Sequence, residues 1–179
     1  MKKHILTAIL AIFIAMPAAA QRLNLDFPGL AERAEEVVDV TLDGSMLRLA
    51  SKFLSDRGEE GAVRTMVQKL EGIYVKSFTF DKDGEYDRAI VDRVRAQIGA
   101  GWNKIVNVRG KRENVEIFVQ TRGELVTGLV VISAEPRELT VVNIVGPIDL
   151  DRLADLEGQF GIPRMTKKEG RDDRRDDRH

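Results

Sequence analysis

The most regular hydrophobic pattern of the chain lies between Glu124 and Leu150, ELVTGLVVISAEPRELTVVNIVGPIDL. It contains two long apolar runs, Leu125–Ala134 and Glu138–Val145, separated by the turn residues Glu135-Pro136-Arg137. Both runs are rich in β-branched residues, which favours strands, and the short turn favours an antiparallel pair. We expect the rest of the domain to pack around this pair.

Both faces of the two strands are apolar, because side chains of either parity along each run are mostly Val, Ile or Leu. A strand with two apolar faces needs cover on both sides. Two alternatives follow: the predicted helices divide between the faces, or one face stays open for a partner. The candidate interaction face consists of Val126, Val130, Ile132, Val142 and Ile144.

The remaining pattern predicts an α+β fold. Period-two spacing predicts further strands, and three-to-four spacing predicts helices that begin after Asp43-Gly44-Ser45 and at three later positions. Short turns predict a C-terminal four-strand meander in an antiparallel sheet of about five to six strands with about four helices. The further strands are 35–42, 72–80, 104–109 and 115–121, and the helices are 45–56, 59–70, 85–98 and 149–157.

The first two helices are expected to form an αα-hairpin laid on the sheet, and the third to pack there as well. Each has an apolar stripe at helical spacing that we expect to face inward. For the residues before the first strand we predict an extended segment and a turn, with a short helix at 29–34. The stripes are Met46, Leu47, Ala50, Phe53 and Leu54; Ala62, Val63, Met66, Val67 and Leu70; and Tyr86, Ile90, Val91, Val94 and Ile98.

The N-terminus has the three regions of a secretory signal peptide. A basic start, Lys2-Lys3-His4, precedes the apolar run Ile5–Met16, and Ala18-Ala19-Ala20 supplies a cleavage site before Gln21. The run is too short to span a bilayer, which takes ~20 residues. We expect export by a Sec-type pathway, cleavage between Ala20 and Gln21, and a periplasmic or secreted protein. Because no cysteine follows the site, we expect no lipoprotein anchor and no stable membrane anchor after cleavage.

The expected domain organisation is a signal peptide at 1–20, one α+β domain at 21–162 and a charged, disordered tail at 163–179. Loss of the two lysines of the signal peptide leaves 26 basic and 29 acidic residues, a net charge of about −3. This balance gives no electrostatic case for nucleic acid as a partner. The RDDR repeats of the tail allow either a solubilising or a docking role.

The sequence offers few groups for catalysis or metal binding. There is no cysteine, and the two histidines are His4 and His179. Nucleophilic sites that need Cys or His, and the usual zinc and haem ligand sets, are therefore excluded from the domain. No S-x-x-K, G-x-G-x-x-G or phosphate-loop pattern occurs. The acidic turn Asp81–Asp87 fails the calcium-loop register, which requires Gly at position 6 and Glu at position 12.

Trp102 is the only tryptophan and follows Gly101 at a predicted helix-to-strand junction. A large ring at such a position either covers the end of the core or forms a ligand platform. The sequence thus predicts no catalytic residue, no cofactor and no metal site.

Several segments together are similar to the family catalogued as domain of unknown function 4252. They are Gly101-Trp102, Gly128-Leu129-Val130-Val131, the run from Glu138 to Gly146, Ile148-Asp149-Leu150, and the signal peptide followed by the "MLRLA…FL" helix pair. The resemblance covers about 27–159. It implies a small exported bacterial protein with no assigned activity. Members resemble lipoproteins, and this chain departs from them by lacking the cysteine.

Three functions remain as hypotheses. The first is a non-enzymatic envelope module that binds an envelope protein or a second copy through its sheet. The second is a carrier of a small apolar ligand between helices and sheet beneath Trp102. The third, an enzyme that uses carboxylates alone, would need two carboxylates opposed across a cleft.

Overall fold

A computed structural model describes residues 22–149 of the chain. Within them the fold is α+β, with a six-stranded antiparallel sheet, three α-helices and one 3-10 turn. The strands are β1 (Glu36–Asp43), β2 (Gly72–Thr79), β3 (Trp102–Arg109), β4 (Asn114–Arg122), β5 (Leu125–Ala134) and β6 (Glu138–Ile148). The helical elements are α1 (Gly44–Ala50), the 3-10 turn η1 (Ser51–Phe53), α2 (Gly58–Lys69) and α3 (Ala89–Gln97).

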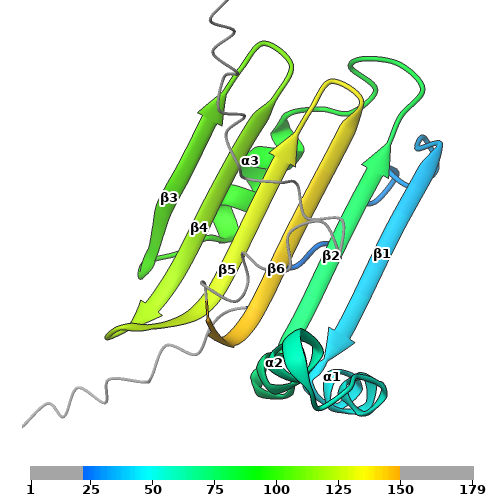
Figure 1. Cartoon of the computed structure of the whole chain (residues 1–179). Helices are drawn as coiled ribbons and strands as arrows, with labels where there is room; N and C mark the ends of the chain where they lie inside the picture. Colours follow the sequence, from blue (N-terminus) through cyan, green and yellow to red (C-terminus); the bar gives the residue numbers. More distant parts are fainter. Residues whose placement is uncertain (1–21, 150–179) are drawn as a thin grey trace, which may run out of the picture.

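The strand order is β1-β2-β6-β5-β4-β3, as Figure 1 shows. The predicted C-terminal meander is confirmed, because β3, β4, β5 and β6 pair in sequence and antiparallel. The β1–β2 hairpin, which contains the α1–α2 insertion, joins the meander through β2 and β6. The two central strands are therefore β6 and β5, the pair with which the hydrophobic pattern began.

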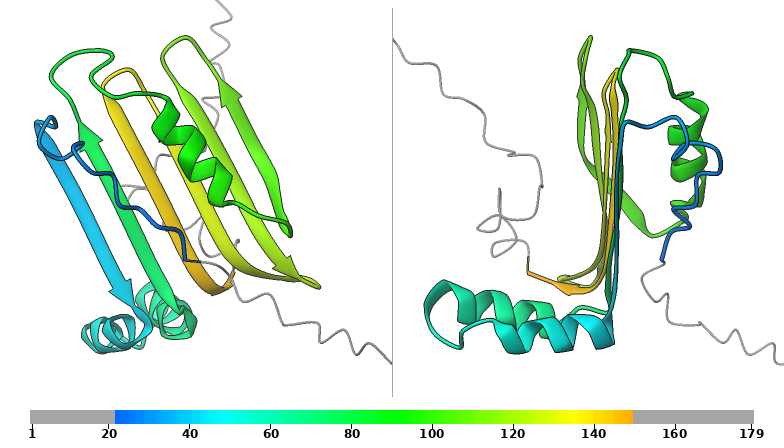
Figure 2. Two further views of the ribbon diagram at one scale, coloured as in Figure 1. Left: turned by 180° about the vertical axis from the view of Figure 1, so that it is seen from behind. Right: turned by 90° about the vertical axis from the view of Figure 1, so that its right-hand side faces the viewer.

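One face of the sheet, here called the covered face, lies beneath α3 and the segment 22–34 (Figure 2). Its core is a continuous cluster in which Phe78, Val130, Ile132, Leu139 and Val141 meet apolar side chains from the cover. Phe27 of the N-terminal segment packs edge-on against Phe78, with ring centroids 5.8 Å apart. These contacts remove most of the apolar surface of this face from water, which is the main stabilising term.

Polar contacts fix the cover to this core. The buried Asn143 of β6 accepts the N–H of Leu23 through its Oδ1 at 2.9 Å. The side chain of Gln97, at the end of α3, exchanges two hydrogen bonds with the backbone of Asn24, at 2.7 and 3.0 Å. The segment 22–34 is thereby held against both the sheet and α3, with a turn rather than the predicted short helix at 28–33.

The opposite face, here called the second face, is also apolar. Its buried side chains come from β4, β5 and β6, in one cluster with Leu47, Val67 and Leu70. Ile73 and Val75 of β2 are partly buried and pack against this cluster. Among the described elements, α1 and α2 stand at one end of this face and project away from the sheet (Figure 2). The prediction of an αα-hairpin is confirmed by α1 and α2, but the hairpin stands at the edge of the sheet instead of lying on it.

Several predicted boundaries differ from the structure. The third helix begins at Ala89 and not at Glu85, because 81–88 form turns. The first helix ends as an α-helix at Ala50 and continues only as the 3-10 turn. The predicted helix 149–157 beyond Asp149, the signal peptide and the charged tail lie outside the described residues.

Candidate interaction surface

The α1–η1–α2 hairpin, called the helical arm below, is the part of the fold that differs most from the expected packing. Its start is well defined, since Asp43 caps α1 through Oδ1, which accepts the N–H groups of Ser45 and Met46 at 2.8 and 2.9 Å. The Ser45 hydroxyl also donates to this oxygen and, with the backbone bonds, lowers the pKa of Asp43. A side-chain cap of this kind fixes where the helix begins.

The other end of the arm is tied to the sheet at one close approach. The N–H of Glu71 donates to the carbonyl oxygen of Val145 in β6 at 2.8 Å. Beside it, Gly146 has φ of 121°, and a Cβ there would lie 2.7 Å from the backbone nitrogen of Glu71. Only glycine allows this backbone conformation and this approach together. The arm is thus anchored at both ends to strands of the sheet.

Only one side of α1 faces the second-face core. Leu47 and Ser51, four residues apart, are buried on that side, and the Ser51 hydroxyl donates to the carbonyl of Arg48 at 2.9 Å. Residues four apart lie above one another on a helix. Apolar side chains of α1 and η1 that are not in line with Leu47 and Ser51 therefore point away from the sheet.

Met46, Leu49 and Phe53 are those offset positions, and they form the exposed stripe of the arm. Their relative exposures are 51%, 57% and 86%. The prediction that Met46, Ala50 and Phe53 face inward is wrong, because α1 is short and its buried positions are taken by Leu47 and Ser51. By contrast, Met66, Val67 and Leu70 of α2 are buried as expected.

The five residues of the predicted interaction face do not share one face in the structure. Val130 and Ile132 belong to the core of the covered face, whereas Val126, Val142 and Ile144 belong to the second face. Val142 and Ile144 lie on the second face because they pair with Val131 and Leu129 of β5, not with Val130 and Ile132. Val126 is separated from Val130 by a register shift in the β5–β6 ladder between Val126 and Gly128. A bulge of this kind adds a residue to one strand and reverses the side to which the next side chains point.

Trp102 is the first residue of β3 and lies opposite Gln120 of β4. It is partly buried and packs against the core of the covered face. Gln120 is buried, and its Oε1 has no hydrogen-bond partner within the described part of the chain. Trp102 therefore packs at the end of the covered-face core, and its role as a ligand platform stays a prediction.

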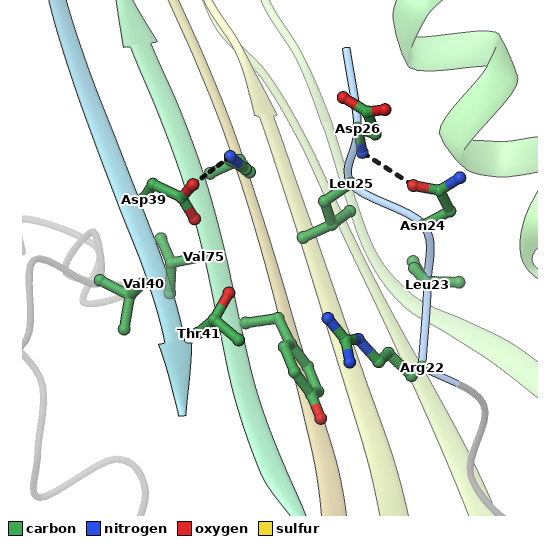
Figure 3. A pocket seen from close by; sticks show the side chains of 11 residues that line it. Arg22, Leu23, Asn24, Leu25, Asp26, Asp39, Val40, Thr41 and Val75 are labelled. Carbon is green, nitrogen blue, oxygen red and sulfur yellow. Dashed lines mark hydrogen bonds and ion pairs between the residues drawn. The ribbon is translucent and has the colours of Figure 1, made fainter. Parts of the chain in front are cut away.

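A pocket of about 460 Å³ lies between the segment 22–26 and strands β1 and β2 (Figure 3). Arg22 lies over the Tyr74 ring, 4.3 Å from its centroid, and Asp39 forms an ion pair with Lys76. Asp39 is therefore paired with a cation. With Asp26 included, the charges of the pocket balance.

Elsewhere in 22–149, the acidic side chains do not form a metal-binding cluster. No group of three or more Asp, Glu, His or Cys side chains in this range is arranged to hold a metal ion. Glu135 is a surface carboxyl whose pKa is raised by partial burial and then by Glu138 and Glu113. None of the helices in the same range is long and apolar enough to cross a membrane.

A family model described as "Domain of unknown function (DUF4252)" matches residues 32–156. The chain belongs to the DUF4252 family. The match includes the exposed stripe and both anchors of the arm, from Asp43 to Gly146, and it confirms the resemblance that the strand motifs indicated. Comparisons of this DUF4252 chain with curated proteins and with solved structures found no match.

Proposed function

We propose that this DUF4252 domain is a non-enzymatic module of the bacterial envelope that binds a protein partner through the exposed stripe of its helical arm. The observation that carries the proposal is the exposure of Met46, Leu49 and Phe53 in one line on a projecting, doubly anchored element. A solvated phenylalanine contributes little to folding, whereas aromatic side chains are enriched where proteins bind one another.

The geometry of the arm supports a protein groove as the complementary surface. Side chains at i, i+3 and i+7 lie on one side of a helix, which is the spacing with which amphipathic helices enter apolar grooves. Arg48 and Lys52 are exposed on the same short segment as Leu49 and Phe53. We therefore expect a groove with an apolar floor and an acidic rim on the partner.

The envelope location rests on the signal-peptide pattern of 1–20, and the non-enzymatic character rests on the residue content of the domain. The sequence has no cysteine and no histidine between His4 and His179. The ion pair of Asp39 with Lys76 is consistent with this reading, since it occupies a carboxylate that lines a pocket.

The test compares Phe53→Asp with Ile105→Asp, a matched change on the opposite edge strand at a side chain that is 53% exposed. Full-length tagged protein is expressed in its host, cross-linked chemically, and the adducts are quantified by mass spectrometry and light scattering. We expect one dominant adduct in the wild type and in Ile105→Asp, and its loss in Phe53→Asp. A wild type without any specific adduct, or equal adducts in both variants, would overturn the proposal.

A further inference from the structure

A second surface with a defined chemistry lies on the covered face, between α3 and the β3–β4 hairpin. It is a groove of about 470 Å³, here called the basic groove. Four cationic and two anionic side chains line it, so its formal charge is +2 in a chain whose overall charge is −1. They are Arg88, Arg95, Lys104, Arg109, Asp92 and Glu116.

The anionic side chains of the groove are already engaged. Glu116 has a side-chain exposure of 5% and forms ion pairs with both Arg95, at 2.5 Å, and Lys104. Asp92 pairs with the Nη1 of Arg95, also at 2.5 Å. Burial by itself raises the pKa of Glu116, but the hydrogen bonds from Lys104 and Arg95 outweigh it and lower that pKa. Glu116 is therefore a carboxylate at neutral pH that holds two cations in fixed positions.

The cationic side chains retain donors that face solvent. Arg95 uses its Nε and Nη1 for the two carboxylates, which leaves the Nη2 amino group. Lys104 gives one N–H to Glu116 and lies 5.0 Å from the centre of the Phe118 ring, which leaves further N–H donors. Within 22–149, neither Arg88 nor Arg109 has a carboxylate at ion-pair distance.

The positions of these groups follow from the fold. Arg88 and Arg95 are seven residues apart at the start and in the last turn of α3, so they lie on one side of the helix. Lys104 and Arg109 belong to the edge strand β3, where a register shift between Lys104 and Val106 adds one residue between them. Because of this bulge, both pair with covered-face residues of β4, Phe118 and Asn114.

We infer that the basic groove binds a phosphate monoester. A phosphate group carries close to two negative charges at neutral pH and three acceptor oxygens, which matches the charge of +2 and the several free donors. Arginine guanidinium groups that are held in place lose less freedom on binding such a group than mobile ones do. Glu116 and Asp92 act here as positioning residues for Arg95 and Lys104.

The first arm of the test uses inorganic phosphate as the probe, titrated into the mature protein at low ionic strength and followed by calorimetry and NMR. We expect saturable binding that weakens as salt is added. Arg109→Ala should lower the affinity about tenfold, as loss of a charge-assisted hydrogen bond does. The control Arg112→Ala removes the same charge from the adjoining turn, outside the groove, and should leave the affinity unchanged. Absence of saturable binding, or equal losses in both variants, would overturn the inference.

The variant Glu116→Gln tests whether phosphate affinity depends on the fixed positions of Arg95 and Lys104 or only on the net charge of the groove. This variant makes the groove more positive, so charge alone would tighten phosphate binding, whereas release of Arg95 and Lys104 weakens it. We expect weaker binding with a native circular dichroism spectrum, and tighter binding would overturn the role of Glu116. If Glu116→Gln does not fold, Arg88→Ala tests the groove from the side of α3, with the same expected loss as Arg109→Ala.

A second arm distinguishes the source of the phosphate. Flotation with phosphatidylcholine vesicles that contain phosphatidic acid presents the monoester as a lipid headgroup. If the wild type binds these vesicles and Arg109→Ala does not, the groove binds a lipid headgroup. Phosphate binding without vesicle recruitment supports the same groove with a soluble phosphate ester.

Discussion

Two short helical segments of this domain use similar apolar side chains in opposite ways. In α3, Ile90, Val91 and Val94 are buried against the sheet, and Val94 is 0% exposed. In α1 and η1, Leu47 alone of the apolar stripe is buried, while Met46, Leu49 and Phe53 face solvent. The stripe of α3 thus belongs to the core of the covered face, whereas the stripe of the arm lies outside the core formed by the described residues.

The positions of the two helical segments relative to the sheet explain why one apolar stripe is buried and the other is exposed. Helix α3 lies across the covered face, so every apolar position on its inner side meets the sheet. The arm meets the sheet only at its base, near Leu47, Val67 and Leu70. Substitutions in the two segments should therefore differ strongly in their effect on stability.

The largest effect is expected from Val94→Asp. It places a carboxylate without a partner in the core of the covered face, which costs on the order of 4 kcal/mol or more and leaves the domain unfolded. Circular dichroism and urea titration measure the loss. A variant that retains the wild-type midpoint would show that α3 does not anchor the fold and would end the comparison.

A smaller loss is expected from Asn143→Ala, which tests the second part of the cover. Removal of Oδ1 leaves the buried N–H of Leu23 without its acceptor, a cost of about 1–3 kcal/mol. We also expect faster hydrogen exchange at the Leu23 amide. Unchanged exchange at this amide would mean that Asn143 does not hold the N-terminal segment on the sheet.

The ion pairs of Glu116 with Arg95 of α3 and Lys104 of β3 make the free energy of unfolding depend on pH. The pKa of Glu116 in the folded state lies below the reference value of 4.5, so the unfolded state binds the proton first. The stability it contributes is present above pH 4.5 and is lost as pH falls through the folded-state pKa. The difference in unfolding free energy between wild type and Glu116→Gln should shrink as pH is lowered from 6 to 3. A constant difference would exclude this contribution.

The smallest effect on stability is expected from Phe53→Asp. A side chain that is 86% exposed contributes little, and surface substitutions usually stay within about 0.5 kcal/mol. Urea titration of Phe53→Asp and Val94→Asp under the same conditions compares the stability losses of the two segments directly. A loss as large as that of Val94→Asp would show that the arm stripe is part of the folded core.

The sequence was most informative where a regular pattern coincided with a short turn. The meander from β3 to β6 was predictable because apolar, β-branched runs are separated by two to five turn residues. The position of β2 beside β6 was not, since no local signal reports which distant strands pair. The inward stripe of α3 was likewise predictable from Ile90, Val91 and Val94.

The surfaces were less predictable for two specific reasons. Ser51 occupies a buried position that a hydrophobic pattern assigns to Ala50 or Phe53, and the 3-10 turn ends the stripe early. The bulge between Val126 and Gly128 moves side chains of one strand to opposite faces. The basic groove depends on a similar irregularity in β3, and its charges are far apart in the sequence.

The most direct test of the arm stripe is a photoreactive benzophenone amino acid placed at position 53 of the full chain in its host envelope, with position 105 as the control. The proposal predicts a discrete covalent adduct from position 53 after irradiation and none from position 105. An adduct of twice the mass identifies a second copy of the chain as the partner, and any other single mass identifies another envelope protein. The absence of an adduct at position 53, in a chain that is folded and exported, would contradict the proposal.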